Sequence, residues 1–223
     1  MNKITEVFDT ATDGRAARWE AHRTARYQEL LKLARKAVHK LGPQASIQEI
    51  ATYAHTSKPV YYRYFGDKEG LRQALGALVI TDFRQRVIAA GLAKTDEASA
   101  LHAMVTAYLE LAANSPNLYF FVTASPRDTA LAGPAADTAQ DASAGALNDF
   151  FDDVSSLIAE RLSKLPAAES SAISLWPRAA LGMVRAAGEQ WLCLPEGAGK
   201  PSLNNLADEL TSWLAYGIAG PSN

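Results

Sequence analysis

Lys58, Arg63 and the tyrosines at 61, 62 and 64 lie within one seven-residue segment, "KPVYYRY". Two cations and three phenol hydroxyls are too polar for an ordinary core, and three aromatic rings are too apolar for an idle surface. Cations attract negative charge, and aromatic rings contact flat or apolar groups. The segment therefore predicts a surface that contacts a negatively charged and partly flat partner.

The charge of the chain is divided unevenly around this segment. Residues 1–90 carry 15 Lys or Arg and 9 Asp or Glu, a net charge of +6, whereas residues 91–223 carry 7 and 15, a net charge of −8. A basic end attached to an acidic remainder predicts a head that binds a polyanion and a body that does not. Chance unevenness on solvated helix faces is the alternative.

Helix signals surround the tyrosine-rich segment. The stretch "RYQELLKLARKAVHKL" has apolar residues at three- and four-residue spacing and is followed by Gly42 and Pro43, which end a helix. Ser46, with Glu49 three residues later, forms a capping box that begins a second short helix. Ser57 is the expected cap of a third helix, with Pro59 in its first turn. A fourth, long helix is expected over residues 67–90, before Gly91.

The remainder of the chain shows helical periodicity and no strand-like alternation. Further helices are predicted around residues 96–114, 116–124, 146–165, 174–194 and 202–220, so the fold class is all-α with about nine helices. We expect an N-terminal arm over residues 1–22 and a helix-turn-helix domain over residues 23–71. A helical regulatory and dimerisation body over residues 72–223 is linked to that domain through helix 67–90.

Two short helices joined by about three residues form a helix-turn-helix when a third helix supports them. In that arrangement the last short helix enters the major groove of DNA by its N-terminal residues. Lys58 and Tyr62 share one face of this helix, where Pro59 and Val60 stand at its leading end. Double-stranded DNA is therefore the predicted polyanion.

The stretches "IATYAHTSK" from Ile50 and "YRYFGDKEGL" from Tyr62 resemble the tetracycline-repressor (TetR) family of bacterial transcription regulators. The resemblance implies that Tyr62, Tyr64 and Lys68 contact phosphates and that Lys58, Pro59 and Val60 face bases. With the neighbouring polar residues, the candidate DNA contacts are Ser46, Gln48, Ser57, Lys58, Pro59, Val60, Tyr61, Tyr62, Arg63, Tyr64 and Lys68.

Two residues depart from the family pattern. His55 stands where the family usually has the turn glycine, so we expect a positive φ there, which histidine tolerates better than most residues. Tyr61 stands where the family usually has a smaller aliphatic residue. Its side chain either enlarges the core of the head or turns its hydroxyl toward the phosphates.

The resemblance also implies a homodimer formed by the last two helices and an operator that is palindromic or nearly so. Two heads must reach half-sites about one helical turn of DNA apart. Small residues allow close helix approach, and large apolar residues supply contact area. The candidate interface comprises Ala179, Gly182, Ala186, Trp191, Trp213 and Leu214.

Aromatic and sulfur-containing residues are frequent in the middle helices and suggest a pocket for an unknown small-molecule effector. The candidates are His102, Met104, Tyr108, Phe120, Phe121, Phe150, Phe151, Trp176 and Met183. The alternative is that these residues form an ordinary core. Pro177 either kinks its helix beside Trp176 or marks the first turn of a helix that starts there.

Nothing in the chain matches a catalytic or metal-binding motif. The four histidines are dispersed, and no HExxH, GxSxG or glycine-rich phosphate loop is present. We therefore expect no enzyme activity, no cofactor and no metal. Apolar runs are too short for a membrane span, no secretory signal follows Met1, and Cys193 has no disulfide partner, so a cytoplasmic location is expected.

The leading hypothesis is a dimeric repressor that a small apolar or amphipathic ligand releases from DNA. The alternatives are an activator or architectural DNA-binding protein without a ligand, and a helical small-molecule-binding protein whose head docks on a protein. For the arm, we expect the first dozen residues to be loosely ordered, with some of Arg15, Arg18, Arg23 and Arg26 reaching the duplex. A helical extension that packs on the body through Trp19 is the other possibility.

Overall fold

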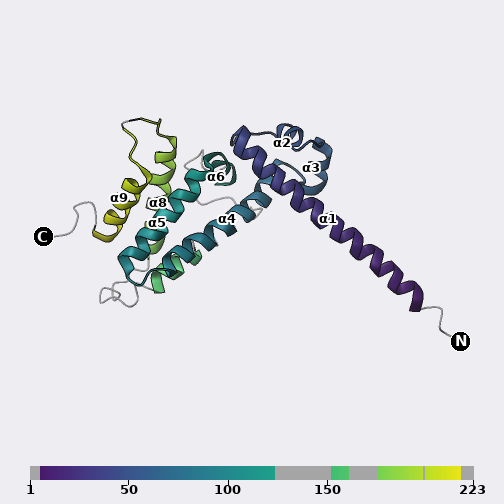
Figure 1. Ribbon diagram of the computed structural model, residues 1–223, viewed down its shortest axis with the longest axis horizontal. Helices are drawn as coiled ribbons and strands as arrows, with labels where there is room; N and C mark the ends of the chain where they lie inside the picture. Colours follow the sequence, from purple (N-terminus) through teal and green to yellow (C-terminus); the bar gives the residue numbers. More distant parts are fainter. Residues whose placement is uncertain (1–5, 124–151, 161–174, 198, 217–223) are drawn as a thin grey trace, which may run out of the picture.

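The computed structural model describes residues 6–123, 152–160, 175–197 and 199–216, and these residues form helices joined by short turns. The described parts contain no strand, as the all-α prediction requires. Figure 1 shows a long first helix crossing the head at one end of the molecule and a bundle of helices forming the body at the other.

The head consists of the second half of α1 (Glu6–Leu41), α2 (Ile47–Tyr53) and α3 (Lys58–Phe65). Gly42 ends α1 with a φ of 105°, a conformation that glycine adopts without strain. The inward face of α1 is a stripe of small and branched apolar residues that are almost fully buried, namely Leu30, Leu31, Ala34, Ala37 and Val38.

The fourth helix connects the head to the body. Asp67 caps α4 (Lys68–Leu92) by accepting a 2.7 Å hydrogen bond from the Gly70 N–H. The helix ends at Leu92 and not before Gly91, where the sequence predicted a stop. Gly91 is buried, and a Cβ at this position would lie 2.7 Å from Met104 Sδ. The glycine therefore allows a neighbouring helix to approach.

The described body contains α5 (Glu97–Asn114), α6 (Pro116–Thr123), helical residues 152–160, α8 (Trp176–Cys193) and α9 (Leu203–Tyr216). Pro177 lies in the first turn of α8, so it begins that helix and does not kink it. The predicted loop at 125–145 and parts of the predicted helix at 146–165 lie outside the described residues.

Two apolar clusters form the core, and their boundary does not follow the expected domain boundary. One cluster joins α1, α2, α3 and the start of α4 to Leu118, Phe121 and Val122 of α6. The other joins the second half of α4 to α5, residues 152–160, α8 and α9. Arg72, only 7% exposed, donates to the Val122 carbonyl at 3.4 Å and pairs with Glu69. Thus α6 is held by the head as well as by the body.

The N-terminal arm is helical and continuous with α1. Residues 6–12, for which we expected loose order, belong to this helix, and no break separates an arm from the head near residue 22. Residues 16–25 are all exposed, and α1 extends away from the body in Figure 1. Trp19 is 63% exposed, so the packing of an extension on the body through Trp19 is also not observed.

Candidate nucleic-acid interface

The second helix of the helix-turn-helix is fixed by its cap. The Ser46 N–H donates to Glu49 Oε2 at 2.8 Å, and the Glu49 N–H donates to Ser46 Oγ at 3.3 Å. This reciprocal capping box satisfies N–H groups that the helix itself leaves unpaired, and the bond from the Ser46 N–H lowers the pKa of Glu49. Ile47, Ile50 and Ala51 then face the core.

The turn between α2 and α3 depends on His55, whose φ is 50°. The expected positive φ is therefore present, and a histidine occupies a conformation that usually favours glycine. Backbone hydrogen bonds from His55 to the Thr52 carbonyl (3.1 Å) and from Thr56 to the Ala51 carbonyl (3.0 Å) close the turn. This turn sets the direction in which α3 leaves the head.

The exposed side of α3 carries the residues that the sequence assigned to DNA. Lys58, Pro59, Tyr62 and Arg63 are exposed, and Val60 and Tyr64 are half-buried. Lys58 Nζ lies 5.4 Å from the centre of the Tyr62 ring, and Arg63 Cζ lies 5.3 Å from the centre of the Tyr64 ring. Each cation is thus paired with an aromatic ring on the protein surface, an arrangement suited to phosphates and to the faces of sugars and bases.

Tyr61 is a correction to the predicted DNA contacts. Its side chain is fully buried, and its hydroxyl donates to the Leu30 carbonyl at 3.1 Å. Burial raises the pKa of Tyr61 to about 12. Of the two possibilities left open by the sequence, the structure supports the enlarged core, because the hydroxyl points to α1 and away from solvent.

The remaining candidate DNA contacts differ in whether their side chains already form hydrogen bonds within the protein. Ser57 occupies the N-cap position of α3 but makes no side-chain cap hydrogen bond, contrary to expectation, and its exposed side chain lies beside Lys58. Gln48 is exposed, and its amide donates to Thr52 Oγ1 at 3.4 Å. The N–H and the hydroxyl oxygen of Ser46 are already bonded to Glu49 in the capping box. Lys68 is exposed at the start of α4 and donates to the Gln44 carbonyl at 3.3 Å.

The N-terminal half of α1 lies beside α3, the helix expected to enter the major groove. Trp19, His22 and Arg23 of α1 and Arg63 and Tyr64 of α3 line a cleft of about 380 Å³. Arg18 and Arg23 are exposed, and Arg26 pairs with Glu29 at 2.7 Å. The side chain of Arg15 lies outside the described residues. The basic residues of the arm therefore extend the surface of α3.

The predicted pocket residues that the structure describes do not line one common cavity among the described parts of the chain. Met104 and Tyr108 line a cavity of about 30 Å³, which is too small for an organic effector. Phe121 belongs to the head cluster, whereas Phe120 and Trp176 pack at the edge of the body cluster. His102 is partly exposed and bonds Asp208 at 2.8 Å, and Met183 is 42% exposed. Phe150 and Phe151 lie outside the described residues.

The predicted dimer residues separate into two groups. Ala179, Gly182 and Ala186 lie exposed on one face of α8, and Trp213 is 37% exposed on α9. Trp191 and Leu214 point instead into the core of the body, and Trp191 Nε1 donates to the Pro201 carbonyl at 2.9 Å. An amphipathic helix buries one face within its own subunit, and these two side chains lie on that face.

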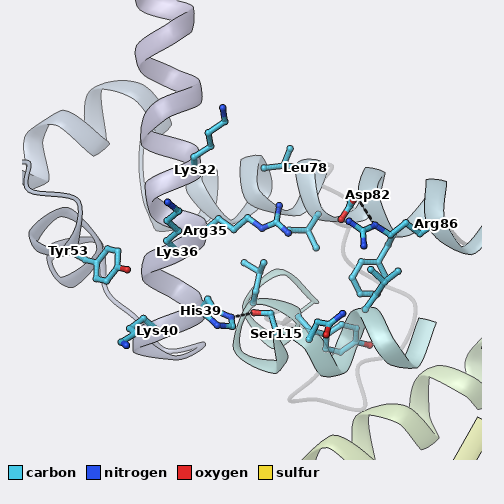
Figure 2. Close-up of a pocket in the computed structure, with 16 residues that line it drawn as sticks. Lys32, Arg35, Lys36, His39, Lys40, Tyr53, Leu78, Asp82, Arg86 and Ser115 are labelled. Carbon is cyan, nitrogen blue, oxygen red and sulfur yellow. Dashed lines mark hydrogen bonds and ion pairs between the residues drawn. The ribbon is translucent and has the colours of Figure 1, made fainter. Parts of the chain in front are cut away.

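A basic groove of about 690 Å³, which was not predicted from the sequence, lies between the head and the body. Its cations come mainly from the last turns of α1, and its apolar wall comes from α4, α5 and α6 (Figure 2). The available signal was a row of Lys and Arg at spacings of three and four residues in "KLARKAVHK". The opposite wall begins at Leu78, which lies 38 residues beyond Lys40 along the chain, so the sequence alone does not place it there.

The described residues contain no group of three or more His, Cys, Asp or Glu arranged to hold a metal ion. Within the same residues, no helix is both long and apolar enough to cross a membrane.

Known proteins were compared with the chain by sequence and by structure. A family model described as "Bacterial regulatory proteins, tetR family" matches residues 30–75, and one described as "Tetracyclin repressor-like, C-terminal domain" matches residues 86–219. An uncharacterized HTH-type transcriptional regulator of Mycobacterium tuberculosis is 36% identical over 115 residues, covering 51% of this chain and 49% of that protein. The chain thus spans about half the length of the curated relatives it matches.

Solved structures with the same fold share little sequence with this chain. The fatty acid degradation regulator FadR of Bacillus halodurans has a TM-score of 0.64 at 18% identity, covering 87% of this chain and 97% of that one. FadR of Bacillus subtilis, solved with stearoyl-CoA, has a TM-score of 0.65 at 18% identity and coverages of 86% and 99%. LfrR of Mycobacterium smegmatis, solved with proflavine, has a TM-score of 0.57 at 19% identity and coverages of 86% and 96%.

The two family models together cover most of the chain, and they divide it where the helix-turn-helix head passes through α4 into the helical body. The resemblance in "IATYAHTSK" and "YRYFGDKEGL" lies largely inside the first matched region. The chain belongs to the tetracycline-repressor (TetR) family of bacterial transcription regulators.

Proposed function

We propose that the protein is a dimeric repressor that binds a palindromic or nearly palindromic DNA operator and is released from it by a small molecule. The exposed face of α3 carries this proposal, because Lys58 and Arg63 lie there beside aromatic rings on a helix-turn-helix with an ordered turn. The net charge of +6 over residues 1–90 adds a long-range attraction for DNA.

Different residues of the head are proposed to contact the bases and the phosphates. Lys58, Pro59 and Val60 at the leading end of α3 contact base edges, and Tyr62, Tyr64 and Lys68 contact phosphates. Ser57, Arg63, Gln48 and the arginines of the arm extend the phosphate-binding surface. The head over residues 23–71 binds DNA, and the body over residues 72–223 dimerises and binds the effector.

Two observations support the dimer and the effector. The exposed stripe of Ala179, Gly182 and Ala186 on α8 lets another helix approach closely, and the exposed Trp213 on α9 offers apolar area. Proteins of the same fold were solved with stearoyl-CoA and with proflavine, so this arrangement of helices accommodates organic ligands in those proteins. A ligand acts on DNA affinity only if it favours one position of the heads over another.

The experiment measures binding of the full chain to the DNA flanking its own gene by fluorescence anisotropy at several salt concentrations. Affinity is expected to fall steeply with salt, since each phosphate contact releases counterions. Lys68→Ala should weaken binding to all sequences alike and reduce the salt slope by about one unit. Lys58→Ala should weaken operator binding more than binding to unrelated DNA.

Lys94→Ala, which changes an exposed lysine of the body, is the matched control. Thermal unfolding of each variant separates a lost contact from a damaged head, because Lys68 also bonds the Gln44 carbonyl. A salt-independent affinity, or equal effects of the Lys58 and Lys94 substitutions, would overturn the proposal.

A further inference from the structure

The groove between head and body combines positive charge with an apolar wall. Lys32, Arg35, Lys36, His39 and Lys40 of α1 line one side. Leu78 and Phe83 of α4, Leu111 of α5, and Leu118 and Tyr119 of α6 line the other. Its volume of about 690 Å³ is in the range of sites that hold small organic ligands.

Most of the cations that line this groove have no acidic partner among the described residues. Asp82 is the acidic residue of the lining, and it pairs with Arg86 at 3.1 Å. Lys32, Arg35, Lys36 and Lys40 form no ion pair within the described residues. Lys32, Lys36 and Lys40 repeat at four-residue spacing, and like charges at this spacing destabilise a helix. An anion bound among them would relieve that repulsion.

Arg35 is placed to hold such an anion. In Figure 2 its side chain reaches from α1 toward α4, across the groove and close to the apolar wall. In the same view Lys32 points upward from α1, and Lys36 lies over the α1 ribbon. A ligand with one anionic group and one apolar group would therefore meet a guanidinium and a hydrophobic surface together, and the guanidinium binds carboxylate and phosphate oxygens through two parallel hydrogen bonds.

The lower edge of the groove is a junction between head and body. His39 Nδ1 lies 2.6 Å from Ser115 Oγ, and the Asn117 amide donates to the His39 carbonyl at 2.9 Å. These bonds join the end of α1 to the turn between α5 and α6. A ligand that enters between α1 and α4 acts on the spacing of the two helices that position α2 and α3.

Hydrogen bonds also connect the apolar wall of the groove to the interior of the body. Tyr119 lines the groove, and its hydroxyl donates to Glu189 Oε1 of α8 at 2.8 Å and lies 2.7 Å from the Tyr108 hydroxyl. Arg185 Nε donates to the same Glu189 oxygen at 2.8 Å. Movement of the Tyr119 ring would thus be transmitted to α8, whose outer face carries the proposed dimer stripe.

We propose that this groove is an effector site for an amphipathic organic anion, held by Arg35 and the neighbouring lysines through its carboxylate or phosphate and by the α4–α6 wall through its apolar part. The inference rests on the proposed regulatory function, names the class of its ligand and extends the effector site from the body to α1 of the head. Binding alters the α1–α4 spacing and so changes the affinity of the heads for DNA.

Isothermal titration of the full chain without DNA tests the site directly. The probes are decanoate, decyl phosphate, decanol and inorganic phosphate, all below the concentration at which they form micelles. Decanoate or decyl phosphate is expected to bind at least tenfold more tightly than decanol and inorganic phosphate, because charge and apolar surface contribute together. Arg35→Ala should weaken binding of the two anionic probes by about tenfold or more, which corresponds to the loss of one charge-assisted interaction.

Arg35→Lys should retain part of that affinity, since it keeps the charge but not the fork of donors. Leu78→Asn should weaken the ten-carbon probes and leave inorganic phosphate unaffected, and Lys94→Ala is the control outside the groove. Absence of binding by both anionic ten-carbon probes overturns the proposal. So does equal affinity for decanol, equal affinity for inorganic phosphate, or an Arg35→Ala variant that binds like the parent.

DNA affinity is then measured by anisotropy with and without the bound anion. A lowered operator affinity in the parent, reduced in Arg35→Ala, supports the coupling. Anion binding that leaves DNA affinity unchanged overturns the regulatory part of the inference while the repressor proposal stands. Failure to bind DNA at all overturns the proposed function, whereas the titration without DNA still reports on the groove.

Discussion

A buried tyrosine of the head bonds a backbone atom, whereas a buried tyrosine that faces the body bonds side chains. Tyr61 of α3 donates to the Leu30 carbonyl of α1, whereas Tyr119 of α6 bonds the side chains of Tyr108 and Glu189. A backbone atom held in a helix cannot move without moving the helix, but a side chain can change rotamer. The head is therefore suited to presenting α3 in a fixed geometry, and the body is suited to adjusting its packing.

Two buried or half-buried glycines of α4 show the same difference. A Cβ at Gly70 would lie 1.9 Å from the carbonyl oxygen of Phe65, the last residue of α3. A Cβ at Gly91 would lie 2.7 Å from Sδ and 2.8 Å from Cγ of Met104, atoms of a flexible side chain. The same helix thus has little freedom at its head end and more at its body end.

The largest expected effect is that of Gly70→Ala. Because the backbone of the turn must shift, this substitution should lower the free energy of unfolding by about 3 kcal/mol in denaturant unfolding. Gly91→Ala should cost about 1 kcal/mol or less, since Met104 can move and alanine favours the helix. Gly182→Ala, which meets no atom within 4 Å, serves as the control. Equal losses at positions 70 and 91 would contradict the contrast between head and body.

Alkaline pH is the second way to compare the two regions. Burial raises the pKa of Tyr61 in the head and of Tyr108 in the body to about 12, and it also raises the pKa of Tyr119. The unfolded chain releases these protons near pH 10, before the folded protein does. Stability is therefore complete below pH 10 and falls as the pH rises toward 12, by up to about 1.4 kcal/mol per pH unit for each such tyrosine.

Urea unfolding of the parent, Tyr61→Phe and Tyr108→Phe between pH 9 and 12 measures this loss. Each phenylalanine variant should lose stability less steeply above pH 10 than the parent does. Parallel curves for all three proteins would show that these hydroxyls ionise alike in the folded and unfolded states.

Helix caps should show the smallest effect and no contrast between the regions. Ser46 caps α2 in the head, and Ser202 accepts from the Asn205 N–H at 3.2 Å at the start of α9 in the body. Alanine at either position should lower the free energy of unfolding by about 1 kcal/mol, the usual value for a lost N-cap. If only one of the two substitutions lowered the free energy of unfolding, the helix caps would contribute to the difference between head and body. We expect no such contribution.

Much of the head was predictable because its determinants are close together in the sequence. The capping box at Ser46, the positive φ at His55 and the helix end at Gly42 are each set by residues within one turn. The sequence left the orientation of Tyr61 open, because a tyrosine side chain can pack in the core or turn its hydroxyl toward the phosphates. The Leu30 carbonyl that accepts its hydrogen bond lies 31 residues away.

The sequence could not say which surfaces the candidate pocket residues meet, for a physical reason. Aromatic residues at helical spacing indicate an apolar face but not what that face meets. Phe120 and Phe121 are neighbours in sequence, yet Phe121 joins the head cluster and Phe120 packs against the body cluster. The cations of the groove lie on α1, outside the segment in which the sequence suggested a pocket.

By itself, the sequence determined the helical class, the family and the surface proposed to bind DNA, since periodicity, caps and a motif of more than twenty residues are local properties. Tertiary structure decided that α6 completes the core of the head and that Trp191 and Leu214 serve the core of the body. It also decided that a row of cations faces an apolar wall. Hydrophobic contacts have no direction of their own, so only the folded arrangement of the helices selects which faces meet.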